Sequence, residues 1–382
     1  MLPSPLTDIE LKEHLKQRAR DLGFSLLGVA SAARPDTLGF FQDWLRAGFH
    51  GTMEYLPRRA AAYEHPSGVQ VGVKSILMAA MNYGPGAFRP AGTGQIAAYA
   101  QGPGDYHDLL RAPLKSLAEE LHQHRPGTRT RMAIDTAPLL ERDLARRAGI
   151  GWFGKNTMLI NKREGSYFFL SAILTDLDLP ADEPHETSHC GTCTLCLEAC
   201  PTGAFPEPYV LDASRCISYL TIELRDQQVP LKLRNGMEDW IFGCDVCQQV
   251  CPWNRRAPGA SQLEFRPERQ PLPSAEEWVA FSEEQFEECF GKTPFSRPGR
   301  IGMARNAAIA MGNSHENSHV PALSAAMCDE SPLVRAAAAW ALGEMTGRAP
   351  RKILEQHLVE ESDAAVRAEI QNALLRQREF ET

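Results

Sequence analysis

The sequence predicts an α/β (α+β) domain, then a bacterial ferredoxin-like domain, then α-helical HEAT-like repeats. Three observations predict this order. Helical and strand-like segments alternate through the first 180 residues, eight of the 10 cysteines crowd into residues 190–251, and an Ala-rich motif recurs near the C-terminus. We expect the domains to span residues 1–180, 181–265 and 301–382, with a connecting segment over 266–300.

The first 180 residues show the hydrophobic patterns of a layered domain. Apolar residues recur at helical spacing over 8–22, and Gly23 follows as a helix end. Apolar runs of strand length then alternate with amphipathic segments, and Pro138 opens the last of the helices. We expect strands over 24–30, 73–83, 95–100, 129–134 and 167–174, and helices over 8–22, around 40–45, and over 106–123 and 139–148.

The C-terminal region repeats itself. The motif Ala308–Gly312 returns as Ala339–Gly343 after 31 residues, and Arg305, Arg335 and Arg367 keep similar steps. This period and the small side chains predict a short array of paired helices of the HEAT type. Two roles stay open for the array: a plain helical cap, and an interaction surface for an extended partner.

The composition is that of a folded chain in water. Hydrophobic residues make up 43% and charged residues 23%, which excludes global disorder, and no apolar run approaches the roughly 18 residues of a membrane span. The first residues carry neither a basic region nor an apolar stretch, so we expect a cytoplasmic protein without a membrane partner. The net charge of −8 favours no nucleic-acid partner, although a local basic face can still bind one. We expect a monomer, because the sequence shows no heptads or large apolar surface segments.

The cysteine spacing indicates two iron–sulfur clusters. The first run is Cys190-x2-Cys193-x2-Cys196-x3-Cys200-Pro201, the bacterial ferredoxin spacing, in which the fourth cysteine serves the other cluster. The second run is Cys244-x2-Cys247-x3-Cys251-Pro252, which lacks one cysteine, and Cys216 replaces it. By this pseudo-symmetry, the predicted ligands of one [4Fe-4S] cluster are Cys190, Cys193, Cys196 and Cys251, and those of the other are Cys200, Cys216, Cys244 and Cys247.

Zinc is the alternative metal, since zinc sites also use paired cysteines. The x2-x2 spacing closed by x3-Cys-Pro disfavours it. Cys289 and Cys328 have no cysteine neighbours in the sequence, and we expect buried, inert thiols there. Two adjacent clusters transfer single electrons, and the other ~300 residues exceed what a simple electron carrier needs.

Two further motifs are excluded as sites. Residues 149–156 nearly match a phosphate-binding loop, but Asn156 replaces the hydroxyl residue that binds Mg²⁺ and a helix precedes the loop, so we reject an ATPase. A glycine- and aromatic-rich loop can still lie against a flat cofactor. Asp105-x-His107 begins like a motif that supplies histidine to cobalamin, but Leu110 stands where glycine is required. We therefore expect His107 to be a polar residue at a helix start and do not assign it as a cobalt ligand.

Asp135 is a candidate proton donor. It ends the apolar segment 129–134, and a carboxyl group at a strand end near buried surface can have a raised pKa. A helix N-cap is the equally supported alternative for this residue.

Five segments together resemble the epoxyqueuosine reductase family, and the likeness extends over nearly the whole chain. They are Ala133–Arg142, Gly149–Thr157, Cys190–Ala204, Cys216–Glu223 and Gly243–Asn254. The resemblance implies an oxidoreductase that reduces epoxyqueuosine to queuosine at the wobble position of a tRNA anticodon, the last step of queuosine biosynthesis. It also implies cobalamin bound base-off on the α/β domain beside two [4Fe-4S] clusters, and a low-potential electron donor such as flavodoxin or ferredoxin.

The resemblance also assigns roles to single residues. Asp135 matches the family's proton donor. The positions matching family contacts with cobalamin are Arg58, Asn156, Met158, Thr221 and Gly243. The lack of a side chain at Gly243 is expected to let the corrin edge approach. One departure is Gln101, which stands where the family pattern leads us to expect arginine.

Positive charge suited to tRNA phosphates gathers in two groups. The first is Arg255, Arg256, Arg266, Arg269, Lys292, Arg297, Arg300 and Arg305, and the second is Arg348, Arg351 and Lys352. A solvated surface is the alternative for any single member. Two other functions stay open: a cobalamin-dependent reductase of a small-molecule epoxide or halide, and a non-catalytic iron–sulfur electron-transfer protein.

Overall fold

The computed structural model describes residues 6–86, 94–262, 265 and 272–379. Its N-terminal part is built on a four-stranded antiparallel sheet with the order β1-β2-β7-β4. The strands are β1 (Leu26–Ser31), β2 (Ser75–Asn82), β7 (Phe168–Thr175) and β4 (Thr130–Ala133). The antiparallel pairing makes this domain α+β, because parallel neighbours would need crossover helices.

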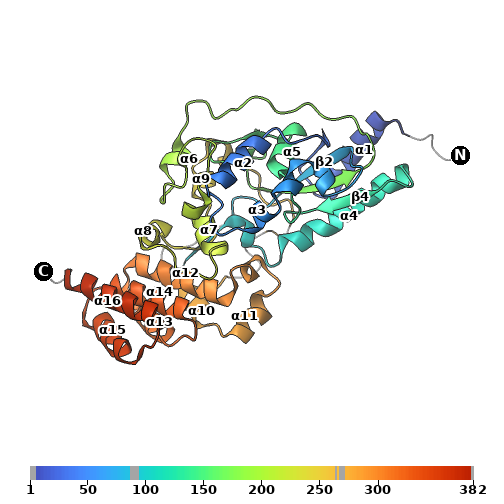
Figure 1. Cartoon of the computed structure of the whole chain (residues 1–382). Helices are drawn as coiled ribbons and strands as arrows, with labels where there is room; N and C mark the ends of the chain where they lie inside the picture. The colour runs from blue at the N-terminus through green and yellow to red at the C-terminus, as the bar shows by residue number, and fades with distance from the viewer. Residues whose placement is uncertain (1–5, 87–93, 263–264, 266–271, 380–382) are drawn as a thin grey trace.

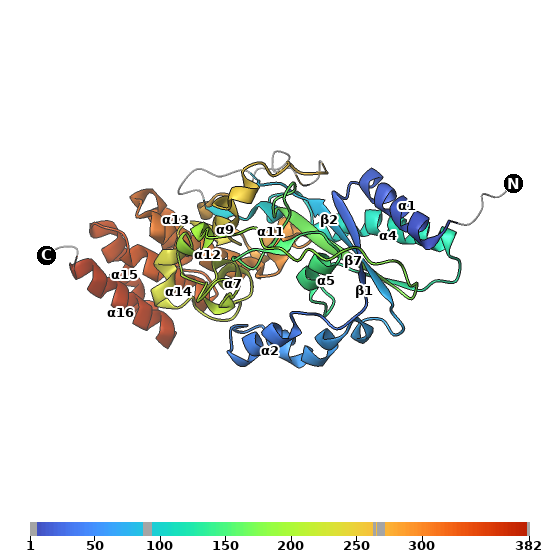
Figure 2. The same cartoon turned by 90° about the horizontal axis from the view of Figure 1, so that it is seen from above.

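Helices cover both faces of the sheet (Figure 2). Successive side chains of a strand point to opposite faces, so Leu77 meets one layer and Ile76 the other. Helices α1 (Asp8–Asp21) and α4 (Tyr106–His124) pack on the first face, and α5 (Glu141–Arg147) packs on the second. The central strand β2 is buried along its whole length, which explains its continuous apolar run.

The cysteine-containing part consists of short elements that lie between the sheet domain and the C-terminal helices (Figure 1). They are α6 (Leu195–Glu198), α7 (Ile217–Ile222), α8 (Leu231–Arg234), β8 (Trp240–Phe242) and α9 (Val246–Gln249). Strand β8 pairs in parallel with β3 (Gln95–Ile96), which joins this part to the N-terminal segment. The other short elements are α2 (Leu38–Arg46), α3 (Tyr55–Arg58), β5 (Trp152–Phe153) and β6 (Leu159–Ile160).

The C-terminal region is helical, as its Ala-rich repeats predict. Its helices are α10 (Ala275–Ala280), α11 (Glu283–Phe290), α12 (Gly299–Ser314), α13 (Val320–Ala326), α14 (Pro332–Gly343), α15 (Arg348–Glu360) and α16 (Ala364–Glu379). The repeated small residues mark helix contacts. A Cβ atom added at Gly312 would lie 2.8 Å from Cα of Ala341, and one at Gly343 would lie 2.6 Å from Cβ of Ala373.

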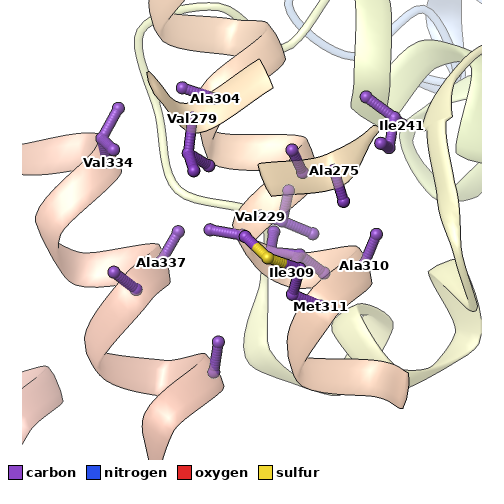
Figure 3. Close-up of a cluster of buried hydrophobic side chains, with 14 of the residues drawn as sticks. Val229, Ile241, Ala275, Val279, Ala304, Ile309, Ala310, Met311, Val334 and Ala337 are labelled. Atoms are coloured by element: carbon purple, nitrogen blue, oxygen red, sulfur yellow. The ribbon is translucent and has the colours of Figure 1, made fainter. Parts of the chain in front are cut away.

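One hydrophobic core runs through the cysteine-containing part and the helical repeats (Figure 3). Val229 and Ile241 from the first belong to the same buried cluster as Ile309 and Met311 of α12. Because the two regions share this core, the repeats hold the segments that carry the cysteines. Among the described residues, no helix has both the length and the apolar character needed to cross a bilayer.

Two predicted elements differ from the structure at their edges. The strand expected over 95–100 ends at Ile96, because its partner β8 is short, and a 3₁₀ turn follows. Helix α5 begins at Glu141, and its N-cap is Leu140, without a side-chain hydrogen bond. The N-cap alternative for Asp135 is therefore wrong.

The expectation that Cys289 and Cys328 are buried is also wrong, because both are exposed. Helix α11 buries Phe286 and Phe290, which lie four residues apart on one face, and Cys289 falls outside that face. Cys328 lies in the turn after α13, directly after the buried residue Met327.

Candidate active site and cysteine centre

Four of the predicted cluster cysteines line one cavity of about 240 Å³. We call them the first cysteine set, and they are Cys190, Cys193, Cys196 and Cys251. Their thiols influence one another: burial, then the charges of Cys251 and Cys190, raise the pKa of Cys196 to about 11. The described residues include all ten cysteines, and none of these forms a disulfide. Free thiols around a cavity provide the donor atoms that a thiolate-bound metal group requires.

The other four predicted cluster cysteines form a second group. We call them the second cysteine set, and they are Cys200, Cys216, Cys244 and Cys247, all of them part-buried. Burial, then the charge of Cys216, raises the pKa of Cys247, and burial likewise raises the pKa of Cys244 well above its usual value. The charge of Cys200 adds to the effect of burial on Cys216. These thiols are thus close enough to influence one another electrostatically.

The hairpin of β5 and β6 contacts both cysteine sets. At its tip, Nζ of Lys155 donates to the carbonyl oxygens of Gly191 at 2.8 Å and Cys193 at 2.9 Å. Asn156 is 3% exposed, and its Nδ2 donates to the carbonyl oxygen of Cys247 at 3.2 Å. The sequence did not reveal this role, because the glycines of the hairpin resemble a phosphate-binding loop.

A cavity of about 380 Å³ lies between the end of β4 and helix α7. We call it the aromatic cavity, and its lining includes Tyr83, Tyr99, Tyr106, Asp135, Glu141, Arg142, Met158, Ser166, Phe168, Phe169 and Ser218. Ser218 lies in α7, whose N-cap is Cys216 of the second cysteine set, so α7 forms part of the cavity wall. The cavity therefore brings together an acidic loop, a set of aromatic rings and the helix that follows Cys216.

Asp135 is held at the aromatic cavity in an unusual backbone conformation. Its φ is 57°, in the left-handed region that non-glycine residues seldom adopt, and its side chain is 66% exposed. Tyr106 donates a hydrogen bond from its hydroxyl group to Oδ2 of Asp135 at 3.0 Å. Burial, then the charge of Asp135, raises the pKa of Tyr106 above its usual range, so the phenol stays a donor.

The structure also brings His107 to Asp135. Nδ1 of His107 lies 2.7 Å from Oδ1 of Asp105, and Nε2 lies 3.8 Å from Oδ2 of Asp135. An ionised carboxylate only accepts, so Asp105 places the proton of neutral His107 on Nδ1. Nε2 is buried and has no hydrogen-bond partner among the described residues. Burial lowers the pKa of His107, but the hydrogen bond and charge of Asp105 outweigh it and raise the pKa overall.

The expectation that His107 lies at a helix start is correct, since Asp105 is the N-cap of α4. Its proximity to Asp135 was missed, because the two residues are 28 positions apart and meet only after β4 joins the sheet. Glu141 completes the acidic group: its Oε1 accepts from the backbone N–H of Asp135 at 3.2 Å. Burial, then the charge of Asp135, raises the pKa of Glu141 to about 8.

The residues that the resemblance assigns to cobalamin are spread around this region. Met158 lines the aromatic cavity, and Arg58 is exposed at the end of α3. Thr221 has none of its surface exposed, and its Oγ1 accepts a hydrogen bond from the N–H of Gly243 at 2.9 Å. Gly243 has a φ of 66°, and a Cβ atom there would lie 2.5 Å from Cβ of Ala97. The chain's own packing therefore requires glycine at this position.

Several basic residues expected to face tRNA are engaged within the protein. Arg305 is fully buried, because α12 packs against α7, and it donates to backbone carbonyl groups there, so the expected surface contact is wrong. Arg300 is 9% exposed and pairs with Asp329 and Glu283, which also contradicts a free phosphate contact.

The remaining candidates differ in exposure. Arg297 pairs with Glu223 and Arg351 with Glu355. The exposed candidates that form no ion pair within the described part of the chain are Arg255, Arg256, Lys292, Arg348 and Lys352. Arg266 and Arg269 lie outside the described residues. At the departure from the family pattern, Gln101 is buried and donates from Nε2 to the carbonyl oxygen of Ile96 at 2.7 Å.

The fold and the site define an iron–sulfur oxidoreductase with a helical-repeat region. Residues 189–254 match the model of a 4Fe-4S double cluster binding domain, and residues 301–375 match HEAT repeats. Residues 64–136 match the model described as "Epoxyqueuosine reductase QueG, DUF1730". Together with the relatives described next, these matches show that the chain belongs to the epoxyqueuosine reductase family.

Two curated relatives illustrate the similarity. The epoxyqueuosine reductase of Pseudomonas aeruginosa is 39% identical over 358 residues, covering 90% of this chain and 98% of the relative. That of Escherichia coli is 38% identical over 365 residues, covering 94% and 95%.

Two solved structures are similar over 97% of this chain and 100% of their own. One is an epoxyqueuosine reductase with a tRNA-Tyr stem loop that carries epoxyqueuosine, with a TM-score of 0.87 and 32% identity. The other is the Bacillus subtilis epoxyqueuosine reductase with the loop of its catalytic aspartate swung out of the active site, with a TM-score of 0.87 and 31% identity.

Proposed function

We propose that this chain reduces epoxyqueuosine to queuosine at the wobble position of tRNA, the last step of queuosine biosynthesis. The observation that carries the proposal is the aromatic cavity, in which Asp135 lies opposite the helix that follows Cys216. A proton donor and a route for electrons thus meet at one place. The tRNA stem loop bound by a similar solved enzyme supports the substrate, and the cytoplasm is the location that we propose with it.

The two cysteine sets are the proposed ligands of the two [4Fe-4S] clusters. The first set borders a cavity of about 240 Å³ with free thiols, and the double-cluster match over residues 189–254 covers both sets. Lys155 keeps the loop of the first set in place through two carbonyl groups. Cys216 of the second set is the N-cap of α7, which lines the aromatic cavity through Ser218, so the second set is the proposed final relay to the reacting centre.

Cobalamin is the proposed cofactor of the aromatic cavity, and when bound it supplies the reducing chemistry that opens the epoxide. The lining suits such a group, because its tyrosine and phenylalanine rings offer flat faces for a planar ring system and its polar side chains can bind amide groups. Met158 belongs to that wall, and Arg58 can reach polar groups of the cofactor from α3. Asn156, Thr221 and Gly243 are proposed to act at its border with the second cysteine set, where Thr221 fixes the backbone of Gly243.

Asp135 is the proposed donor of the proton to the oxygen that leaves the substrate. The reaction takes up two protons, so a single carboxyl group must be recharged or assisted. His107 is placed to do this in its imidazolium form, which its raised pKa favours, because Asp105 holds the Nδ1–H and the proton on Nε2 faces Oδ2 of Asp135. The loop of a catalytic aspartate that swings out in a similar solved enzyme supports assigning this role to an aspartate on an exposed loop.

Nucleoside mass spectrometry on tRNA bearing epoxyqueuosine tests the proposal. The tRNA is incubated without oxygen with cluster-loaded protein, cobalamin and dithionite, and the modified nucleoside is expected to lose one oxygen only when cobalamin is present. Asp135→Asn is expected to abolish this conversion while tRNA binding remains. If wild-type protein with both clusters and bound cobalamin leaves the nucleoside unchanged, the tRNA substrate is refuted and small epoxides become the next substrates to assay.

A further inference from the structure

The cavity of the first cysteine set lies beside an exposed apolar side chain. Leu195 of α6 lines the same cavity as these cysteines and is 42% exposed, although it is a large apolar side chain. Figure 1 shows α6 at an outer edge of the molecule. The second set lies beside the aromatic cavity instead, because Cys216 is the N-cap of α7 and Ser218 of α7 lines that cavity. An electron from outside that is bound for the aromatic cavity therefore enters through the first set.

Four exposed basic residues flank this cavity. Arg255 and Arg256 follow Asn254, the residue after Trp253, and Trp253 lines the cavity together with Cys251. Lys162 and Arg163 lie in the turn that follows another lining residue, Ile160.

The two basic segments lie against each other. The N–H of Ser166, just after the turn, donates to Oδ1 of Asn254 at 2.7 Å, and Asn254 directly precedes Arg255. The charge of Lys162 contributes, after burial and the charge of His189, to the lowered pKa of His185. We call Lys162, Arg163, Arg255 and Arg256 the basic rim.

The basic rim stands out against the rest of the chain, whose net charge is −8. None of its four side chains is paired with an acid in the described part of the chain. Two acidic residues of the neighbouring segments accept hydrogen bonds from polar side chains: Glu164 from Asn82, and Glu198 from Thr194. Four unpaired cations around an exposed leucine form a surface that complements an acidic partner.

We infer that this basic rim and Leu195 are the docking surface of the electron donor, a small acidic protein that carries a low-potential flavin or iron–sulfur group. The inference rests on the proposed function, because it concerns how the first cysteine set receives electrons. In each encounter the reduced donor gives up one electron and the group held by the first cysteine set gains it. No bond forms or breaks, and two encounters supply the two electrons of one turnover.

Stopped-flow spectroscopy of cluster reduction tests this surface directly, without the tRNA reaction. Oxidised, cluster-loaded protein is mixed without oxygen with a purified acidic flavodoxin in its fully reduced form, and the visible absorbance of the clusters is followed. The test variant is Arg255→Glu/Arg256→Glu. The matched control is Arg34→Glu/Lys74→Glu, which makes the same change of charge at two exposed residues beside the paired ends of β1 and β2.

At low salt, the test variant is expected to be reduced at least about tenfold more slowly than wild type, and the difference should disappear near 1 M salt. The control should stay within twofold of wild type. Dithionite, which needs no docking surface, should reduce all three proteins equally. Binding of a tRNA anticodon stem loop to the same variant, measured by fluorescence anisotropy, separates this docking role from a contact of Arg255 and Arg256 with tRNA phosphates.

Three results overturn the inference. Equal reduction rates for wild type and the test variant remove the docking role, and an equal slowing of the control shows a general effect of charge. Weakened stem-loop binding with an unchanged reduction rate makes the rim an RNA-binding surface instead. A different failure, in which dithionite does not bleach even the wild-type protein, refutes the proposed clusters themselves.

Discussion

Arg305 offers a sharp test of how the repeats support the cysteine centre, because it is a fully buried cation without an acidic partner among the described residues. Its guanidinium donates to the carbonyl oxygen of Leu220 at 2.8 Å, to that of Gln227 at 2.8 Å, and to that of Leu224. These carbonyl groups belong to α7 and the turn after it, and α7 begins at Cys216. The perturbation is Arg305→Leu, which keeps apolar contacts and removes every donor.

The expected loss follows from the groups left behind. Each buried carbonyl without a donor costs about 1–3 kcal/mol, while removing a buried charge returns part of its desolvation penalty. Burial lowers the pKa of Arg305 to about 10, which means that the buried guanidinium carries a desolvation penalty. With three carbonyl groups affected, we expect the free energy of unfolding to fall by about 3 kcal/mol. Arg305→Lys retains one cationic donor group and should lose about half as much.

Urea unfolding of cluster-loaded protein, followed by far-ultraviolet circular dichroism without oxygen, measures this loss. Arg348→Leu, at an exposed residue of the same region, is the control and should change the unfolding free energy by less than about 0.5 kcal/mol. Because α7 loses its support, Arg305→Leu should also retain less iron. The reasoning is refuted if Arg305→Leu keeps wild-type stability but loses tRNA binding, since that pair of results describes a surface contact.

Three further predictions concern the aromatic cavity. His107→Gln should slow product formation in a single turnover about tenfold or more and leave tRNA binding intact, and an unchanged rate at every pH would remove the histidine from proton transfer. The pKa of Glu141 is raised from 4.5 to about 8 in the folded protein, so its contribution to stability is complete below pH 4.5 and is lost as the pH rises through about 8. In urea unfolding at a series of pH values, Glu141→Gln should reduce this fall of the midpoint with pH. Parallel curves of midpoint against pH for the variant and wild type would contradict the prediction. Thr221→Val leaves the N–H of Gly243 without its acceptor and should lower the unfolding free energy by about 1–2 kcal/mol, whereas Thr221→Ser keeps the hydroxyl group and should retain most of the wild-type stability. Equal losses of stability in the two variants would show that packing of the Thr221 methyl group, and not the hydrogen bond, is what matters.

The sequence predicted those parts of the fold that depend on local patterns. Buried strand β2, helix α4 and the small residues at helix contacts each leave a periodic signal, and the observed elements follow it. Strand β3 was predicted too long because its length is set by β8, which pairs with it from 144 residues further on. A pattern within one segment carries no information on the length of a distant partner.

The same limit explains the outcome for the site. Cysteine spacing is a local signal, whereas the neighbours of Asp135 are assembled by the sheet. Neither the approach of His107 nor the contact of Glu141 with the backbone at Asp135 has a sequence signature. Charge alone also misplaced Arg305, because an arginine that caps buried carbonyl groups looks in the sequence like one that faces solvent.

The left-handed backbone at Asp135 has a consequence for how this protein balances stability against chemistry. Glycine adopts a φ of 57° without strain, so Asp135→Gly should fold at least as well as wild type while losing the carboxyl group. The aspartate is thus retained at a position where a more permissive residue is available. Alanine would add backbone strain of its own, whereas asparagine tolerates the same conformation, which makes Asp135→Asn the inactive variant whose fold stays closest to the native one.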